Sequence, residues 1–197
     1  MKEIGRGAEA RLLLENYQQV EVVEKRREAK PYRNPKLDLR IRSARTKAEA
    51  GILQRARSIG VRTPRVLKVE LENSGLFLEY LKGKRMKESF QAWMAGELGK
   101  NIALLHSNGI IHGDLTTSNV IVRGKKLALI DFSLGYYAKD VEDFATDLLG
   151  LQKTFQATHP GKEKEWKQLL RAYEKGFAKG KTVFGHMKEI EARARYS

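Results

Sequence analysis

The chain has 197 residues, 41% of them hydrophobic, and no cysteine, which excludes disulfide bonds, thiolate zinc sites and cysteine nucleophiles. Lysine and arginine number 38 against 24 acidic residues, and the resulting net charge of +14 favours polyanionic partners such as nucleic acids or nucleotides. Because no apolar run approaches the roughly 20 residues that cross a bilayer, we expect a soluble, cytoplasmic protein with no membrane partner.

The first 80 residues have the pattern of a small antiparallel sheet with one helix. Residues 10–16 and 20–25 are β-type runs joined by a polar link, and residues 66–71 and 76–81 flank the turn sequence Glu-Asn-Ser-Gly. Between the two pairs, residues 46–59 are rich in Ala, Glu, Leu and Arg, which predicts a helix. We therefore expect the order strand, strand, helix, strand, strand.

A strongly basic segment lies within this first part of the chain. Residues 25–47 contain ten lysines and arginines against two acidic residues, Glu28 and Asp38. Arginine predominates there beside Tyr32 and two prolines, which favours phosphate binding over a merely solvated face. A smaller basic cluster, at 193 and 195, lies near the C-terminus.

The second part is predicted to be helical around one hairpin. From Ser89, which can cap a helix, apolar residues recur at helical spacing up to the end signal Asn108-Gly109. Residues 119–122 and 127–131 are apolar runs joined by Arg-Gly-Lys-Lys, which predicts a β-hairpin. Further helices are expected over about 140–155 and 162–179, and the tail after them is polar and basic, either helical or ordered only by a partner.

Three polar side chains are expected to meet beside this hairpin. Asp114 lies in the segment His-Gly-Asp-Leu-Thr-Thr-Ser-Asn, and Asn119 and Asp131 stand at the two outer ends of the hairpin. Carboxylate and amide oxygens suit Mg²⁺, and Asp114 can take or orient a proton. We expect His112 to hold the loop by a backbone hydrogen bond. A plain polar turn is the alternative interpretation.

The pattern His-Gly-Asp-Leu-x-x-x-Asn, then a hairpin, then Ile-Asp-Phe resembles the catalytic and metal loops of the protein kinase superfamily. That resemblance implies a bilobal α+β fold, with a small antiparallel-sheet N-lobe and one helix over residues 1–81. A reduced helical C-lobe would occupy residues 82–187, followed by a basic tail at 188–197. The implied cofactors are ATP and Mg²⁺, with Asp114 as the catalytic residue and Asn119 and Asp131 as metal ligands.

The same resemblance assigns nucleotide contacts. Lys25 becomes the lysine that contacts the phosphates and Glu49 its ion-pair partner, with Arg26 and Arg27 as alternatives to Lys25 in the alignment. The lid sequence Gly-Arg-Gly-Ala-Glu-Ala lacks the third glycine of the usual motif, and residues 78–81 resemble the hinge that binds adenine. The implied nucleotide-binding residues are Gly5, Gly7, Glu9, Lys25, Glu49, Glu79, Leu81, Asn119 and Asp131.

A narrower resemblance rests on Gly-Ala-Glu-Ala at 7–10, the basic stretch after the lysine, the 112–119 segment and residues 142–160, which end in Ala-Thr-His-Pro. Together they resemble the small atypical kinase of the KEOPS (EKC) complex, the PRPK-like family, over nearly the whole chain. This implies a Ser/Thr protein kinase and ATPase that supports threonylcarbamoyladenosine (t6A) formation in tRNA.

The partners implied by this resemblance are two proteins and an RNA. The tRNA threonylcarbamoyltransferase subunit would bind the C-lobe, a small tRNA-binding KEOPS subunit the N-lobe, and tRNA the basic segment 25–47 and the C-terminal tail. Only 16 positions separate Asp131 from Asp147, and the sequence has no Ala-Pro-Glu, so a full activation segment does not fit. Gly113 replaces the arginine that would receive an activation-loop phosphate, and Ser133 replaces the usual glycine of the metal loop.

Two other functions remain open at the level of sequence. A small-molecule kinase of the aminoglycoside type would need an acidic substrate pocket in an enlarged C-lobe, and this chain is short and basic for that. A basic tRNA-binding scaffold that uses nucleotide only as a conformational switch would fit the charge equally well. Loss of ATP hydrolysis without loss of RNA binding, on removal of the Asp131 carboxylate, distinguishes the enzyme from the scaffold.

Overall fold

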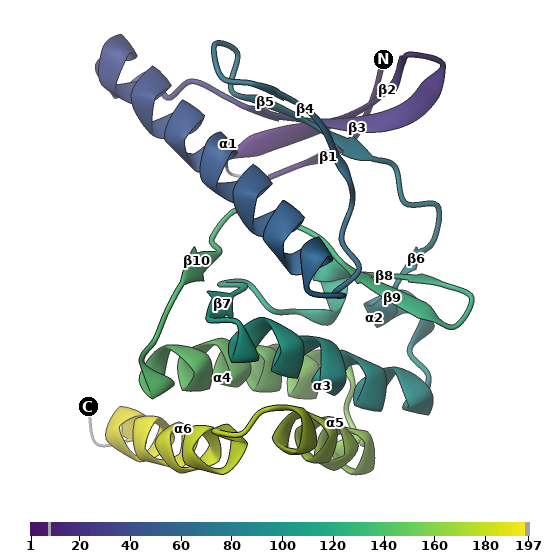
Figure 1. The fold of residues 1–197 in the computed structure, drawn as a ribbon, viewed down its shortest axis with the longest axis vertical. Helices are drawn as coiled ribbons and strands as arrows, with labels where there is room; N and C mark the ends of the chain where they lie inside the picture. The colour runs from purple at the N-terminus through teal and green to yellow at the C-terminus, as the bar shows by residue number, and fades with distance from the viewer. Residues whose placement is uncertain (8, 196–197) are drawn as a thin grey trace.

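The upper part of the molecule in Figure 1 is a five-stranded antiparallel sheet crossed by one long helix, with strand order β1-β2-β3-β5-β4. The structure is a computed structural model that describes residues 1–7 and 9–195, without the side chain of residue 195. The elements are β1 (Lys2–Arg6), β2 (Ala10–Tyr17), β3 (Val20–Arg27), α1 (Pro35–Ser58), β4 (Val66–Glu70) and β5 (Gly75–Glu79).

The helix α1 begins eleven residues before the predicted start at residue 46 (46 − 35 = 11). Asn34 caps it, because its side-chain oxygen accepts hydrogen bonds from the backbone N–H groups of Lys36 (3.0 Å) and Leu37 (3.4 Å), and Pro35 takes the first helical position. The buried carboxylate of Asp38 accepts a 2.6 Å bond from Arg42 one turn later. The prediction missed this first part of the helix because basic residues interrupt the spacing of apolar residues that indicates a helix.

The lower part of Figure 1 is helical, and a short sheet joins it to the upper part. Helices α3 and α4 form one layer, and α5 packs on α3 while α6 packs on α4. The elements are β6 (Lys84–Arg85), α2 (Met86–Ser89), α3 (Ala92–Ser107), β7 (Ile110–Ile111), η1 (Thr117–Asn119), β8 (Val120–Arg123), β9 (Lys126–Leu129), β10 (Tyr136–Tyr137), α4 (Val141–Thr158), α5 (Glu163–Gly176) and α6 (Gly180–Arg195).

Two helix predictions in this part were wrong. Ser89 ends the short helix α2, with its hydroxyl bonded to the Arg85 carbonyl, and α3 starts after Gln91. The single helix expected over 162–179 is two helices, since the chain turns after Gly176 and α6 starts at Gly180. The polar tail is helical as far as residue 195, and residues 196–197 lie outside the described part. The lobe boundaries given above stay predictions.

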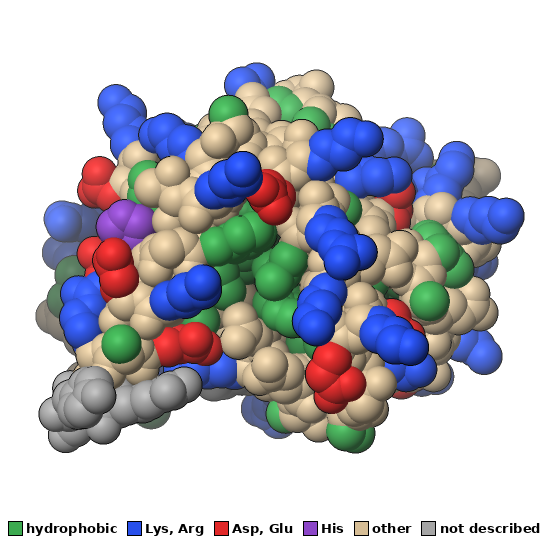
Figure 2. Space-filling view, turned by 90° about the horizontal axis from the view of Figure 1, so that it is seen from below, with side chains coloured by type: hydrophobic (Ala, Val, Ile, Leu, Met, Phe, Trp, Pro, Cys, Tyr) green, Lys and Arg blue, Asp and Glu red, His purple; other side chains and the backbone are tan. Residues whose placement is uncertain are grey.

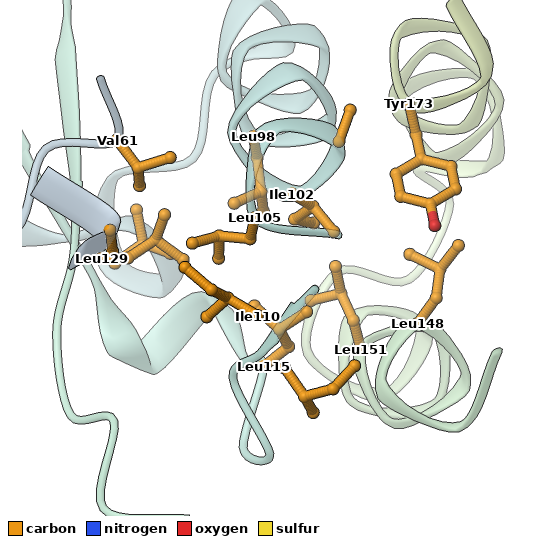
Figure 3. Packing of buried hydrophobic residues seen from close by; sticks show 14 of the residues in the cluster. Val61, Leu98, Ile102, Leu105, Ile110, Leu115, Leu129, Leu148, Leu151 and Tyr173 are labelled. Carbon is orange, nitrogen blue, oxygen red and sulfur yellow. The ribbon is translucent and has the colours of Figure 1, made fainter. Parts of the chain in front are cut away.

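The hydrophobic core lies mainly between the helices of the lower part, as Figure 3 shows for Leu98, Ile102, Leu105, Leu148 and Leu151. These side chains are fully buried, and each stabilises the fold by about 1.5–3 kcal/mol. The same cluster continues upward through α1 and β5, with members at 53 and 76, so both parts share one core. The loops between them are therefore fixed in position.

The outer surface of the helical part carries charged side chains of both signs, with Lys and Arg more prominent than Asp and Glu (Figure 2). Figure 2 views the molecule from below and shows Lys and Arg side chains spread around a hollow whose floor is hydrophobic. Within residues 1–7 and 9–195, every helix is too short or too polar to cross a bilayer.

Candidate active site

A cleft of about 380 Å³ is lined by residues of the sheet, of α1 and of the segment around the hairpin β8–β9. Apolar side chains form much of the lining, and Lys25, Glu49 and Asp131 form a charged cluster, which is called the charged end below. The cleft is lined by Ile4, Leu12, Val23, Lys25, Glu49, Pro64, Leu78, Glu79, Tyr80, Leu81, Gly83, Arg85, Glu88, Asn119, Ile121, Ile130 and Asp131. Apolar walls with a few convergent charges are typical of a ligand site.

The charged end is organised by Lys25 of β3. Its ammonium nitrogen lies 2.7 Å from Glu49 Oε1 on α1 and 2.7 Å from Asp131 Oδ1 after β9. The side chains of Lys25 and Glu49 are 7% and 1% exposed, so this is an interior ion pair and not a solvated one. The structure brings together these three predicted residues from segments 24 and 106 positions apart.

Asp131 has a strained backbone and an anionic side chain. Its φ of +63° lies in the left-handed region, which is unusual for a residue other than glycine and is found at functional sites. Burial would raise the pKa of Asp131, but the charge of Lys25 and hydrogen bonds from Lys25 and Ser133 outweigh burial and lower the pKa to about 2. Ser133, which stands where related loops have glycine, thus holds one carboxylate oxygen.

Asn119 lies at the end of η1, between Asp114 and the metal loop. Its amide nitrogen donates to the backbone oxygen and to Oδ2 of Asp114, both at 2.9 Å, and its backbone oxygen accepts the N–H of Ile130 at 2.9 Å. The amide oxygen is therefore the atom suited to a cation. Asp114 itself lines a neighbouring hollow of about 260 Å³, next to Thr116, with Asp143 and Tyr136 on its far side.

The loop of residues 112–119, the predicted catalytic loop, is fixed by a buried polar network. Asp147 of α4 accepts the backbone N–H groups of His112 (3.0 Å) and Gly113 (2.9 Å), and it bonds His106 at 3.2 Å. His112 Nδ1 accepts the N–H of Asp114, so its Nε2–H donates to the Ile130 carbonyl at 3.1 Å, as the sequence predicts. Burial lowers the pKa of His112, which favours the neutral ring, and only the neutral ring can accept at Nδ1 while it donates from Nε2.

Gly113 is required by its surroundings. Its φ is +80°, and a Cβ built there would lie 2.2 Å from the carbonyl oxygen of Leu134. The segment that contains Leu134 is held by a turn at Gly135 and by pairing of β10 with β7. The space beside residue 113, where the protein kinase superfamily carries an arginine, is therefore filled by the backbone of Leu134.

Gly113→Ala is expected to lower the free energy of unfolding by about 2–4 kcal/mol, because the added methyl both clashes and forces a left-handed conformation. Urea unfolding of the variant measures the loss. Gly51→Ala is the matched control: in α1 the same methyl would meet no heavy atom within 4 Å among the described residues. It should add about 0.5–1 kcal/mol of stability. A Gly113→Ala protein as stable as the wild type would contradict the packing described.

The predicted lid and hinge differ in how they meet the cleft. Glu79 and Leu81 line it, as the hinge prediction requires, whereas the described lining does not include Gly5, Gly7 or Glu9. The N–H of Gly7 donates to the carbonyl of residue 10 in a tight turn, and Glu9 forms ion pairs with Arg27 and Arg45. The nucleotide roles of these three residues stay predictions.

Comparison with known proteins matches residues 11–140 to the RIO domain. The KEOPS complex subunit Bud32 of Pyrococcus abyssi is 37% identical, over 100% of this chain and 96% of the relative. The chain belongs to the Bud32 branch of the RIO domain family. It also matches a probable bifunctional tRNA threonylcarbamoyladenosine biosynthesis protein of Methanobrevibacter smithii, with 39% identity over 98% of this chain. The chain spans about a third of that relative's length, since it covers 36% of it.

Two solved structures show the fold of this Bud32-family chain. The Rio2 kinase of Chaetomium thermophilum, in complex with ADP, Mg²⁺ and phosphoaspartate, superposes with a TM-score of 0.69 at 15% identity, over 98% of this chain and 70% of the other. WaaP, in complex with acyl carrier protein, superposes with a TM-score of 0.66 at 14% identity, over 99% and 88%. Both confirm the expected bilobal kinase-like fold.

The Ala-Thr-His-Pro signature of this Bud32-family chain has a structural explanation. His159 follows α4 and lies against the ring of Phe90, with 4.5 Å between the ring centres. Its Nε2 bonds the hydroxyl of Thr117 at 3.0 Å, inside the catalytic loop. The histidine therefore stabilises the loop at Thr117, while Asp147 stabilises it at residues 112 and 113.

Sequence reasoning missed several residues around this Bud32-type site. Arg27 was considered only as an alternative to Lys25, and no role was predicted for His106, which bonds Asp147. Gly83 brings the chain close to β8, since a Cβ there would lie 2.4 Å from the Val122 carbonyl. The alternation of side chains along β3 could have indicated Arg27, because residues two apart on a strand lie on the same face and Arg27 is two residues after Lys25. No comparable pattern marks His106.

Proposed function

We propose that the chain binds Mg·ATP in the cleft and transfers the γ-phosphoryl group to a Ser or Thr hydroxyl of a protein, or to water. The observation that carries this is the convergence of Lys25, Asn119 and Asp131 at one end of an apolar cleft, beside the loop that holds Asp114. Membership of an atypical kinase family supports it, as does the ADP and Mg²⁺ bound by the Rio2 neighbour.

Each residue has a role in this proposal. Leu12, Val23 and Ile130 enclose the adenine. The N–H of Glu79 donates to the Arg65 carbonyl. The backbone carbonyl of Glu79 and the backbone of Leu81 are therefore the groups that hydrogen-bond the adenine. When nucleotide binds, the ammonium of Lys25 leaves Asp131 and contacts the phosphates, and its ion pair with Glu49 is kept. Bound Mg²⁺ would neutralise phosphate charge, and Mg²⁺ sites often use one or two carboxylates plus phosphate oxygens and water.

Asp114 acts on the acceptor in this proposal. The bond between the γ-phosphorus and the ADP oxygen breaks as the bond to the acceptor oxygen forms, and the acceptor proton passes to the Asp114 carboxylate. Asn119 fixes that carboxylate by its 2.9 Å bond to Oδ2. The acceptor reaches Asp114 through the hollow of about 260 Å³ beside it. The hollow stays open because the segment of residues 132–137 is short and lies against the 112–119 loop.

The proposed biological role is support of t6A formation in tRNA within a KEOPS complex. Relatives at 37–39% identity carry names of that complex and of t6A biosynthesis. Some are called bifunctional and are about three times as long, which supports a partner that supplies the tRNA threonylcarbamoyltransferase activity. We propose that this partner binds the C-lobe, whose lower face has a hydrophobic hollow with charged residues of both signs around it (Figure 2). We propose that the small tRNA-binding subunit binds the N-lobe.

Turnover of ATP by the purified chain tests the proposed function. Phosphate release should require Mg²⁺ and should rise on addition of the transferase subunit and tRNA, with a peptide library as the competing acceptor. The tRNA-binding scaffold predicts RNA binding with no release of phosphate above background under any of these conditions. That result, with binding of Mg·ADP retained, would overturn the enzyme proposal in favour of the scaffold.

The exposed side of α1 is the proposed tRNA contact. Charge reversal at three exposed positions, Lys36, Arg40 and Lys47 to Glu, should raise the dissociation constant for tRNA by about 10²-fold or more at 0.1 M salt and reduce its salt dependence. Filter binding at several salt concentrations measures both. The control reverses Lys100, Lys125 and Lys126, which are exposed on the helical part. Equal losses from both triple variants would show that only net charge matters.

A further inference from the structure

Arg27 is a buried arginine close to the cleft that the proposed mechanism does not use. It lies two residues after Lys25 on β3, so the two side chains leave the same face of the sheet. Its side chain is only 3% exposed, and its terminal nitrogens contact two carboxylates. Nη2 lies 2.7 Å from Glu49 Oε2, and Nη1 lies 3.3 Å from Glu9 Oε2. A buried guanidinium needs such partners to offset its lost hydration.

Glu49 is consequently held by two cations, one on each carboxylate oxygen. Lys25 bonds Oε1 at 2.7 Å and Arg27 bonds Oε2 at 2.7 Å. A flexible ammonium alone leaves a carboxylate free to rotate, whereas a guanidinium donates in a fixed plane. When phosphates draw the ammonium of Lys25 away from Asp131, Arg27 still keeps Glu49 in place.

The second contact of Arg27 connects this pair to the loop before β2. Glu9 follows Gly7 in the predicted phosphate lid, and its other carboxylate oxygen pairs with Arg45 of α1. The hydrogen bond from Arg45 lowers the pKa of Glu9 more than burial raises it. Ion pairs of alternating sign therefore run from the surface of α1 through Glu9, Arg27 and Glu49 to Lys25.

We propose that Arg27 is a positioning residue for phosphoryl transfer: it holds Glu49, and through Glu49 the ammonium of Lys25, where the nucleotide phosphates bind. Its bond to Glu9 ties the lid loop to the same assembly. Arg27 is not itself part of the described cleft lining, and it acts on the site through the carboxylates of Glu49 and Glu9. This inference rests on the proposed function, because the position of Lys25 matters to the reaction only if phosphates bind there.

Four variants test the proposal: Arg27→Gln, Arg27→Lys, Glu9→Gln and the charge-matched control Arg55→Gln, whose arginine is exposed at the far end of α1 and bonds Asn108. Arg27→Gln should lower kcat for ATP turnover by about 10–100-fold with KM changed less than about 3-fold, as for other residues that orient a functional group. Arg27→Lys should recover only part of kcat, since an ammonium keeps the charge beside Glu49 but lacks the fixed plane of the guanidinium. Glu9→Gln should mainly raise KM, and Arg55→Gln should leave both constants unchanged.

Three results would overturn the inference. The first is an Arg27→Gln variant whose kcat equals that of the wild type. The second is an Arg27→Lys variant that loses as much kcat and as much thermal stability as Arg27→Gln, because equal losses would mean that Arg27 has a merely structural role. If the wild type itself shows no turnover, the proposed function has failed, and hydrogen exchange then decides about Arg27. Amides of residues 45–53 in α1 should exchange at least about 10-fold faster in Arg27→Gln than in the wild type, with α3 unchanged, and equal rates there are the third contrary result.

Discussion

Asp131→Asn is expected to reduce ATP turnover by about 10³-fold, which corresponds to about 4 kcal/mol of transition-state stabilisation. Because the pKa of Asp131 is about 2, its side chain is fully anionic at pH 7, and asparagine keeps the shape while it removes the charge. A neutral amide is a poor substitute for a carboxylate beside Mg²⁺ and two phosphates. Initial rates of phosphate release at saturating Mg·ATP measure the effect.

The fold should tolerate this change. Lys25 keeps Glu49 as a partner at 2.7 Å, and the side chain of Asp131 is 39% exposed, so the free energy of unfolding should change by no more than about 1 kcal/mol. Asp140→Asn is the control, since Asp140 is exposed before α4 and its side chain makes no capping hydrogen bond. Turnover by Asp131→Asn within 10-fold of that control would contradict the metal role assigned to the carboxylate.

Asp147→Asn is expected to lower the free energy of unfolding by about 3 kcal/mol and kcat by about 10²-fold. The carboxylate accepts two backbone N–H groups, from His112 and Gly113, and a third bond from His106, all in the interior. An asparagine turns one of its own N–H groups toward a donor, which leaves two buried donors facing each other. The loop that carries Asp114 then loses its anchor.

The effect of Asp147 should depend on pH in a defined direction. Burial would raise its pKa, but the hydrogen bond and charge of His106 and the contacts of His112 lower it below the ordinary 3.8. The unfolded chain then binds more protons than the folded chain between the lowered value and 3.8, so the stabilisation is complete above 3.8 and is lost as pH falls through the lowered value. Urea unfolding of both proteins from pH 7 to pH 3 should show a difference that narrows at acid pH. A constant difference would contradict a charged Asp147.

The central part of the site could be predicted because its residues are close in sequence or tied by a hairpin. Asp114, Asn119 and Asp131 lie on one loop and at two paired strand ends, so local rules bring them together. Lys25 and Glu49 depended on the resemblance to kinases, since exposed Lys and Glu look the same in a sequence. The structure gives the reason for the choice of Lys25: it faces α1, whereas Arg26 turns to the other face and pairs with Glu24.

The features that sequence analysis missed are tertiary. The first three turns of α1 are stabilised by Asn34 and by the buried Asp38, which holds Arg42, and a string of basic residues conceals the helical period. The two-residue strands β7 and β10 form only because the segment after Asp131 folds back onto the catalytic loop. Such elements have no periodic signal of their own. The boundary between α5 and α6 was not predicted either, because no periodic signal marks it.

The central claim is that one divalent ion and one nucleotide bind where Lys25, Asn119 and Asp131 converge. The most direct measurement is a crystal structure of the chain with ADP and Mn²⁺, with diffraction data recorded at the manganese absorption edge. The account predicts an anomalous peak at roughly 2–2.5 Å from a side-chain oxygen of both Asn119 and Asp131, with the β-phosphate near the Lys25 ammonium. A nucleotide bound elsewhere, or a manganese peak away from both oxygens, would contradict it.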